Sequence, residues 1–68
     1  MDELMGKKLI NNRGDIGTIT EVDRTIYHDN HSKDNPWIKI SLDRDPTGYQ
    51  SHNGCLKTLT LVDWRFLD

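Results

Sequence analysis

The chain of 68 residues contains no alanine, the residue that most favours a helix. Its single cysteine, Cys55, excludes the intramolecular disulfides that a small secreted chain often needs, so we expect a reducing, cytoplasmic location. The start Met1-Asp2-Glu3 is acidic where a signal peptide is basic. No stretch approaches the roughly 20 apolar residues that cross a bilayer. We therefore expect no membrane partner.

Excess charge of either sign is missing as well. Nine Lys and Arg stand against 11 Asp and Glu, which gives a formal net charge of -2 without any block of like charge. This balance disfavours a nucleic-acid partner held by bulk electrostatics, although a local basic patch would still permit one. Apolar residues make up 34% of the chain, enough for one thin core with no pocket behind it. Residues 1–68 are expected to form a single domain.

The residues that are abundant favour strands and turns. Val, Ile and Thr supply 14 residues, and their branched side chains prefer a pleated surface. Asp, Asn, Gly and Pro supply 21, and they fall between the apolar segments, where turns are expected. Short strands with frequent turns predict an all-β fold, either a small barrel or a sandwich.

Apolar periodicity places the strands along the chain. The clearest is Trp37–Leu42, in which Ile38, Ile40 and Leu42 alternate with Trp37, Lys39 and Ser41. A longer strand, Ile16–Ile26, cannot satisfy its core pattern if straight, so a bulge or bend is expected between Gly17 and Glu21. Further strands are expected at Lys7–Asn11, starting at Tyr49–Ser51, and at Leu59–Val62. Trp64 and Phe66, near the end of the chain, are expected to belong to the core. A loop is expected at His28–Asn35, and turns are expected at Asp43–Gly48 and His52–Gly54.

The segment Gly14-Asp15-Ile16-Gly17-Thr18-Ile19-Thr20-Glu21-Val22 resembles the G-x-x-G-x-[VI]-x-x-[VI] core of KOW-type and related SH3-like small barrels. In that pattern the first glycine makes a turn and the second lets the strand bend tightly. The resemblance implies a barrel of about five short, strongly bent antiparallel strands. It also implies a family whose members mostly bind RNA or protein partners, and the acidic balance of this chain departs from the nucleic-acid-binding members.

An exposed aromatic residue is the best candidate for binding. If Ile38, Ile40 and Leu42 face inward, then Trp37 faces outward beside Lys39, and an aromatic ring next to a cation can stack a base or grip a peptide. Tyr27 and Tyr49 flank the loops at either end of that strand. The candidate binding residues are Trp37, Lys39, Tyr27 and Tyr49. The alternative is that Trp37 caps the open end of the barrel.

Two pairs of residues have the spacing of metal ligands. His28-x-x-His31 and His52-x-x-Cys55 could each place nitrogen or sulfur atoms on one zinc ion across a turn. The alternative, which we favour, is solvated loop histidines and a small, partly buried thiol. No metal and no cofactor is therefore assigned.

Nothing in the sequence suggests an active site. Cys55 and His52 have no third group to orient the imidazole, the carboxylates are scattered through turns, and no phosphate-binding glycine loop is present. The favoured hypothesis is a small non-catalytic binding module, a protein-interaction or regulatory factor of bacterial or phage type, with a protein partner. The alternative is a nucleic-acid-binding, KOW-like accessory domain that zinc could stabilise.

Overall fold

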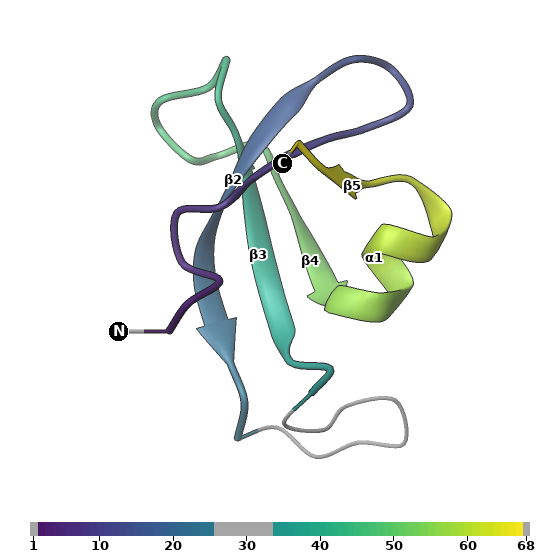
Figure 1. Cartoon of the computed structure of the whole chain (residues 1–68). Coiled ribbons are helices and arrows are strands. Elements are labelled where there is room, and N and C mark those ends of the chain that lie inside the picture. Colours follow the sequence, from purple (N-terminus) through teal and green to yellow (C-terminus); the bar gives the residue numbers. More distant parts are fainter. Residues whose placement is uncertain (1, 26–33, 68) are drawn as a thin grey trace.

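The computed structural model describes residues 2–25 and 34–67. Five antiparallel strands form one sheet in the order β4-β3-β2-β1-β5 (Figure 1). In chain order the elements are β1 (Lys8–Ile10), β2 (Ile16–Asp23), β3 (Trp37–Leu42), β4 (Ser51–Cys55), helix α1 (Leu56–Val62) and β5 (Arg65–Phe66). The expected small all-β fold of five antiparallel strands is confirmed. Within residues 2–25 and 34–67, no helix is long and apolar enough to cross a membrane.

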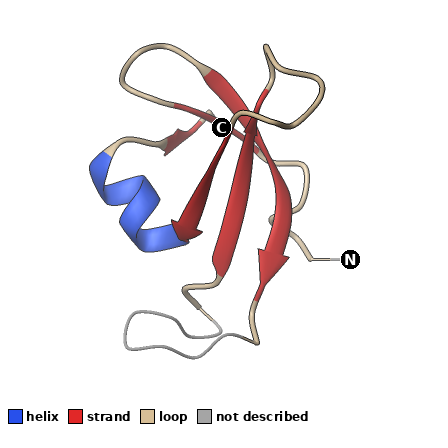
Figure 2. Cartoon of the chain, turned by 180° about the vertical axis from the view of Figure 1, so that it is seen from behind, coloured by secondary structure: helices blue, strands red, loops and turns tan. Residues whose placement is uncertain are grey.

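The sheet is curled but does not close into a barrel. Each of the first four strands pairs with its neighbours in the chain, and β5 returns to pair with β1. The two edge strands, β4 and β5, are joined by α1 and do not pair with each other (Figure 2). The prediction of a closed barrel is therefore wrong, because β4 and β5 remain as the two edges of the sheet.

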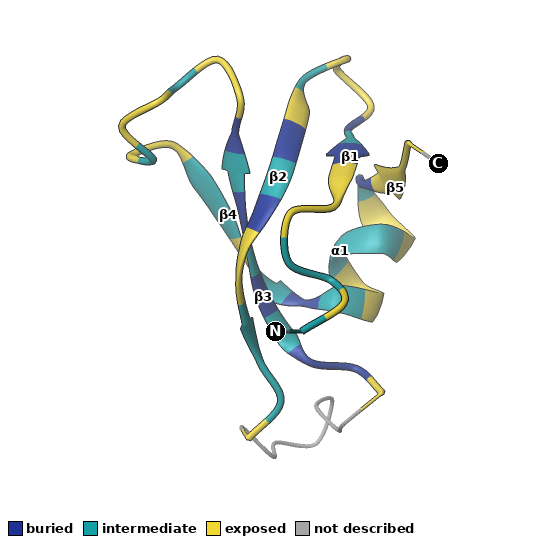
Figure 3. Cartoon of the chain, turned by 60° about the vertical axis from the view of Figure 1, so that its left-hand side comes forward, coloured by how far each residue is buried: buried dark blue, intermediate teal, exposed yellow. Residues whose placement is uncertain are grey.

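Strand β3 supplies half of the core by strict alternation. Ile38 and Ile40 are fully buried and Leu42 is nearly so, while the side chains between them point to the other side of the sheet. These three residues pack with Leu9, Ile19 and Trp64. The colouring of Figure 3 shows the same division in β2, where buried positions alternate with more exposed ones. The prediction that Ile38, Ile40 and Leu42 of β3 face inward is confirmed.

The predicted bulge lies in the second strand. The pairing of β2 with β3 shifts by one residue between Ile19 and Glu21, so that Thr20 is the extra residue. Before the shift Ile19 lies opposite Ile40, and after it Val22 lies opposite Ile38. Residues directly opposite each other in an antiparallel pair point to the same side, so the bulge puts both apolar side chains on the core face. The strand ends at Asp23, before the expected Ile26, which lies outside the described residues.

Gly17 packs closely against Ile40 and Trp64 in the core. A Cβ atom on Gly17 would stand 3.2 Å from Cη2 and Cζ3 of Trp64 and would overlap Cγ2 of Ile40. Gly17 is therefore required for the close packing of the strand against Ile40 and Trp64. Gly14, by contrast, has a φ of 86° and makes the expected turn. Trp64 is buried as predicted, but Phe66 is 37% exposed and is not a core residue.

Residues 56–62 form a helix, which corrects the strand expected at Leu59–Val62. Leu56 and Leu59 are spaced three apart, and both pack against the core. The first turn is capped by a distant residue: the amide N–H of Lys57 donates to Oδ1 of the buried Asn35 at 2.8 Å. A contact from another part of the chain thus decides between two apolar patterns that the local sequence fits about equally well.

The turn expected at His52–Gly54 is also wrong, because these residues lie inside strand β4. They pair with β3 in an unbroken register from Trp37 opposite Cys55 to Ser41 opposite Ser51. The preceding turn at Asp43–Gly48 is confirmed, and Gly48 adopts a φ of 75° there. Asp45 organises it, because its carboxylate accepts hydrogen bonds from the backbone N–H of Thr47 at 3.1 Å and of Gln50 at 2.7 Å.

Candidate functional site

The side of the sheet that faces away from Trp64 is largely polar, and we call it the outer face. In β3 it carries Trp37, Lys39 and Ser41, which alternate with the core residues. The strand register adds residues from the neighbouring strands: Lys8, Thr18, Thr20, Glu21, Asp23, Ser51 and Asn53. This continuous surface contains two of the residues predicted to bind a partner.

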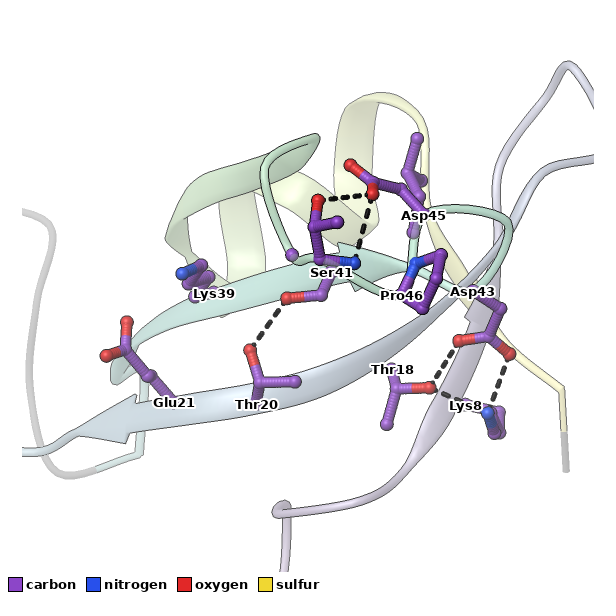
Figure 4. Close-up of a pocket in the computed structure, with 12 residues that line it drawn as sticks. Lys8, Thr18, Thr20, Glu21, Lys39, Ser41, Asp43, Asp45 and Pro46 are labelled. Atoms are coloured by element: carbon purple, nitrogen blue, oxygen red, sulfur yellow. Dashed lines mark hydrogen bonds and ion pairs between the residues drawn. The ribbon is translucent and has the colours of Figure 1, made fainter.

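The middle of the outer face is a groove of about 710 Å³ whose polar groups bond to one another (Figure 4). Lys8 Nζ donates to Thr18 Oγ1 at 2.7 Å and contacts Asp43 Oδ2 at 2.6 Å, and Thr18 Oγ1 donates to Asp43 Oδ1 at 2.6 Å. These bonds to Lys8 and Thr18 lower the pKa of Asp43. Lys8, Thr18 and Asp43 are therefore already bonded to one another in this groove.

Trp37 lies at one end of the outer face, beside a second hollow. The hollow measures about 420 Å³ and is lined by Trp37, Met5, Glu21, Val22 and Asp23. Trp37 is half-buried, and it stands opposite Asp23 on one side and Cys55 on the other. Its ring is on the face opposite the core, which does not support the alternative in which Trp37 caps the open end of the fold. The lining of this hollow combines the apolar residues Met5, Val22 and Trp37 with the acids Glu21 and Asp23.

The structure brings together only part of the predicted binding set. Trp37 and Lys39 are neighbours on the outer face of β3. Tyr49 is 90% exposed and precedes β4, beyond the opposite end of β3. At about 3.3 Å per strand residue, the length of β3 separates Tyr49 from Trp37 by roughly 17 Å. Tyr27 lies outside the described residues.

The proposed zinc ligands do not converge within the described part of the chain. His28 and His31 lie outside the described residues. His52 stands opposite Ile40 on the core face, whereas Cys55 stands opposite Trp37 on the outer face, so the pair cannot hold one ion. The sequence predicts that His52 and Cys55 lie across a turn, but both residues belong to strand β4. In residues 2–25 and 34–67, no group of three or more His, Cys, Asp or Glu side chains could hold a metal ion.

His52 instead has a packing role. Its imidazole meets the indole of Trp64 edge to face, with ring centroids 5.5 Å apart and an angle of 63° between the planes. Because His52 is on edge strand β4 and Trp64 precedes β5, this contact spans the two strands that do not pair. It closes the core where backbone hydrogen bonding does not.

A third hollow, which the sequence analysis missed, lies at the start of β4. It measures about 440 Å³, and its lining includes Arg13, Arg44, Tyr49 and Ser51. Arg44 Nε is 3.4 Å from Asp15 Oδ1, and the side chain of Arg44 is 60% exposed. The two arginines come from different turns, so no sequence spacing could have indicated that they share a hollow.

Two further carboxylates, those of Asp2 and Asp45, stabilise the fold. Asp2 accepts hydrogen bonds from Arg24 Nε at 2.5 Å and from the amide of Leu4 at 3.0 Å, and these bonds lower the pKa of Asp2 from 3.8 to about 2. Bonds from Thr47 and from the Gln50 amide lower the pKa of Asp45. In its ionised form, Asp2 stabilises the N-terminal segment and Asp45 stabilises the turn before β4.

Comparisons with known proteins give no relative. No family model matches the chain, and neither the curated proteins nor the solved structures contain a significant match.

Proposed function

We propose that the chain is a small non-catalytic binding module of the SH3-like type, which recognises a protein partner with the outer face around Trp37 and Lys39. The observation that carries this proposal is the position of Trp37. A large aromatic side chain is half-exposed on the polar side of a domain whose apolar residues are few, and it lines a hollow beside Met5 and Val22. Half-buried aromatic rings of this kind are the anchors on which protein interfaces depend.

The charges of the outer face favour a protein over a nucleic acid. Lys8 is paired with Asp43 at 2.6 Å, and Lys39 stands directly opposite Glu21 in the sheet. Both outer-face lysines therefore have an acid as neighbour, and Glu21 and Asp23 border the Trp37 hollow. A phosphate backbone would meet these carboxylates as well as the lysines.

The test places a photo-reactive benzoylphenylalanine at Lys39 in the cells that produce the chain, with a matched probe at the exposed Thr58 of α1 as control. A partner that cross-links from Lys39 and not from Thr58 is then purified and its affinity is measured by titration. We expect Trp37→Ala to weaken this binding at least tenfold while the variant stays folded. A complex that forms equally well with Trp37→Ala would contradict the proposal.

A salt series separates the two functional hypotheses. Binding to single- or double-stranded oligonucleotides that weakens steeply with ionic strength would favour the nucleic-acid hypothesis and overturn ours. A protein complex whose affinity changes little with salt supports the proposed function.

A further inference from the structure

Strand β4 is an edge of the sheet that lacks the usual protection. Edge strands are normally guarded by charged side chains, proline or a bulge. The sequence of β4, Ser-His-Asn-Gly-Cys, has no lysine, arginine, acid or proline, and its register with β3 is unbroken. The other edge, β5, is only two residues long. Of the two edges, β4 is therefore the one that can accept another strand.

The hydrogen-bond pattern shows which groups of β4 are directed outward. The amide of Leu42 donates to the carbonyl of Gln50 at 3.2 Å, and the amide of Leu56 donates to the carbonyl of Pro36 at 2.9 Å. In an antiparallel pair the residues that exchange bonds alternate with residues that do not. His52 and Gly54 are therefore turned toward β3, whereas the N–H and C=O groups of Ser51 and Asn53 point to the open side.

The surroundings of this edge define the side chains of a matching strand. On the core face it would lie beside His52 and Gly54. Leu59 of α1 is close to Gly54, because a Cβ on Gly54 would be 3.6 Å from Leu59 Cγ, so an apolar side chain of the incoming strand would have an apolar neighbour there. On the outer face it would lie beside Ser51 and Asn53, which favour polar side chains. Alternating polar and apolar residues satisfy both faces.

The hollow at the start of β4 adds a charge preference. Two guanidinium groups, those of Arg13 and Arg44, line it, and among its lining residues only Asp15 carries a carboxylate. The hollow therefore has an excess of positive charge, next to Ser51, at the end of the open edge. A carboxylate on the incoming strand would be complementary to it.

From these observations we infer that β4 accepts an extended segment of a partner protein as a sixth strand. The segment alternates polar and apolar residues, and an acidic residue at one end contacts Arg13 and Arg44. This inference rests on the proposed function, because it names the class of partner and the way in which the partner binds.

The experiment uses four fluorescent peptides and the chain of residues 1–68. Two probes are Glu-Thr-Val-Thr-Val-Thr-Ser and its reverse order, which present the acid at either end, and their controls carry lysine in place of glutamate. We expect one glutamate peptide to bind at least tenfold more tightly than its lysine control, and its direction gives the orientation of the added strand. Equal affinities, or no binding of any peptide at millimolar concentration, would overturn the inference.

Two variants locate the binding. A chain prepared by chemical synthesis with an N-methyl group on the backbone nitrogen of Asn53 loses an outward donor, while the backbone bonds of His52 and Gly54 to β3 are kept. We expect this chain to bind at least tenfold more weakly. The double variant Arg13→Gln and Arg44→Gln should remove the preference for glutamate over lysine without affecting the edge. Full affinity in the N-methyl chain would overturn the inference, as would an unchanged preference in the double variant.

Two further outcomes distinguish a failure of the added strand from a failure of the proposed function. If the partner found by cross-linking is lost in Trp37→Ala but bound fully by the N-methyl chain, the proposed function stands and the added strand is wrong. If sedimentation shows dimers that the N-methyl group abolishes, β4 pairs with a second copy of the chain, and the inference is also overturned.

Discussion

A Cβ atom added to Gly17 would stand 3.2 Å from the indole of Trp64, so the two residues pack with little space for a side chain between them. Two positions far apart in the sequence are thus packed together in the core. Glycine and tryptophan, the smallest and largest side chains, fit each other here.

Substitution of Gly17 by alanine tests this contact. The added Cβ would overlap Ile40 and crowd Trp64, so we expect Gly17→Ala to lower the free energy of unfolding by about 1–3 kcal/mol. The matched control is Gly54→Ala, where the new Cβ would make ordinary contacts of 3.6–3.8 Å with Leu59. We expect Gly54→Ala to leave stability unchanged or to raise it by about 0.5–1 kcal/mol. Urea denaturation measures both, and equal effects would contradict the account.

The two tryptophans should differ sharply when each is replaced. Trp64 is 1% exposed, so Trp64→Ala is expected to lower the free energy of unfolding by about 3–5 kcal/mol. Most molecules of this variant should be unfolded at room temperature. Trp37 is half-buried on the outer face, so Trp37→Ala should cost about 1 kcal/mol and leave a folded domain. Thermal unfolding followed by circular dichroism distinguishes them. A chain unfolded by Trp37→Ala would restore the capping role for that residue.

Asn35 should contribute to stability through the start of α1. Asn35→Ala removes the acceptor for the Lys57 amide, and we expect a loss of about 1–2 kcal/mol in the free energy of unfolding. Asn35→Asp keeps an acceptor oxygen and should recover part of that loss. The exposed Asn53 serves as control, since Asn53→Ala should change stability by less than about 0.5 kcal/mol. Equal losses at the two positions would show that the cap has no energetic role.

The ion pair between Asp2 and Arg24 predicts a dependence on pH. Because the folded pKa of Asp2, about 2, is below its ordinary value of 3.8, the ionised carboxylate stabilises the fold fully above that ordinary value. This stabilisation is lost as the pH falls through the folded pKa. We expect Arg24→Gln to raise the pKa of Asp2 toward 3.8 in an NMR titration.

A matched substitution controls for this effect. The bond from Lys8 contributes most to the lowered pKa of Asp43. Lys8→Met should therefore raise the pKa of Asp43 and leave the pKa of Asp2 unchanged. An Asp2 pKa that stays near 2 in Arg24→Gln would refute the assignment.

The sequence was most informative where structure depends on local alternation. Ile38, Ile40 and Leu42 alone define the faces of β3, and so they also place Trp37 and Lys39 on the outer face. The bulge followed from Ile19 and Val22, whose spacing no straight strand can bury on one side. In both cases the pattern needs no knowledge of the rest of the chain.

Elements that depend on distant contacts could not be predicted. The segment Leu56–Val62 has apolar residues at both two- and three-residue spacing, and the buried Asn35 and the core decide for a helix. Ser51–Cys55 contains residues typical of turns and becomes a strand because β3 pairs with it. The hollow lined by Arg13 and Arg44 depends on the pairing of β2 with β3, because only the folded sheet brings those two turns together.

The central claim is that recognition takes place on the outer face and along the β4 edge. The most direct test is amide hydrogen–deuterium exchange, measured for the chain alone and for its complex with the cross-linked partner. We predict fast exchange at Ser51 and Asn53 in the free chain, beside slow exchange at His52 and Gly54, and new protection of Ser51 and Asn53 in the complex. Protection that appears only in α1, with β4 unchanged, would contradict the account.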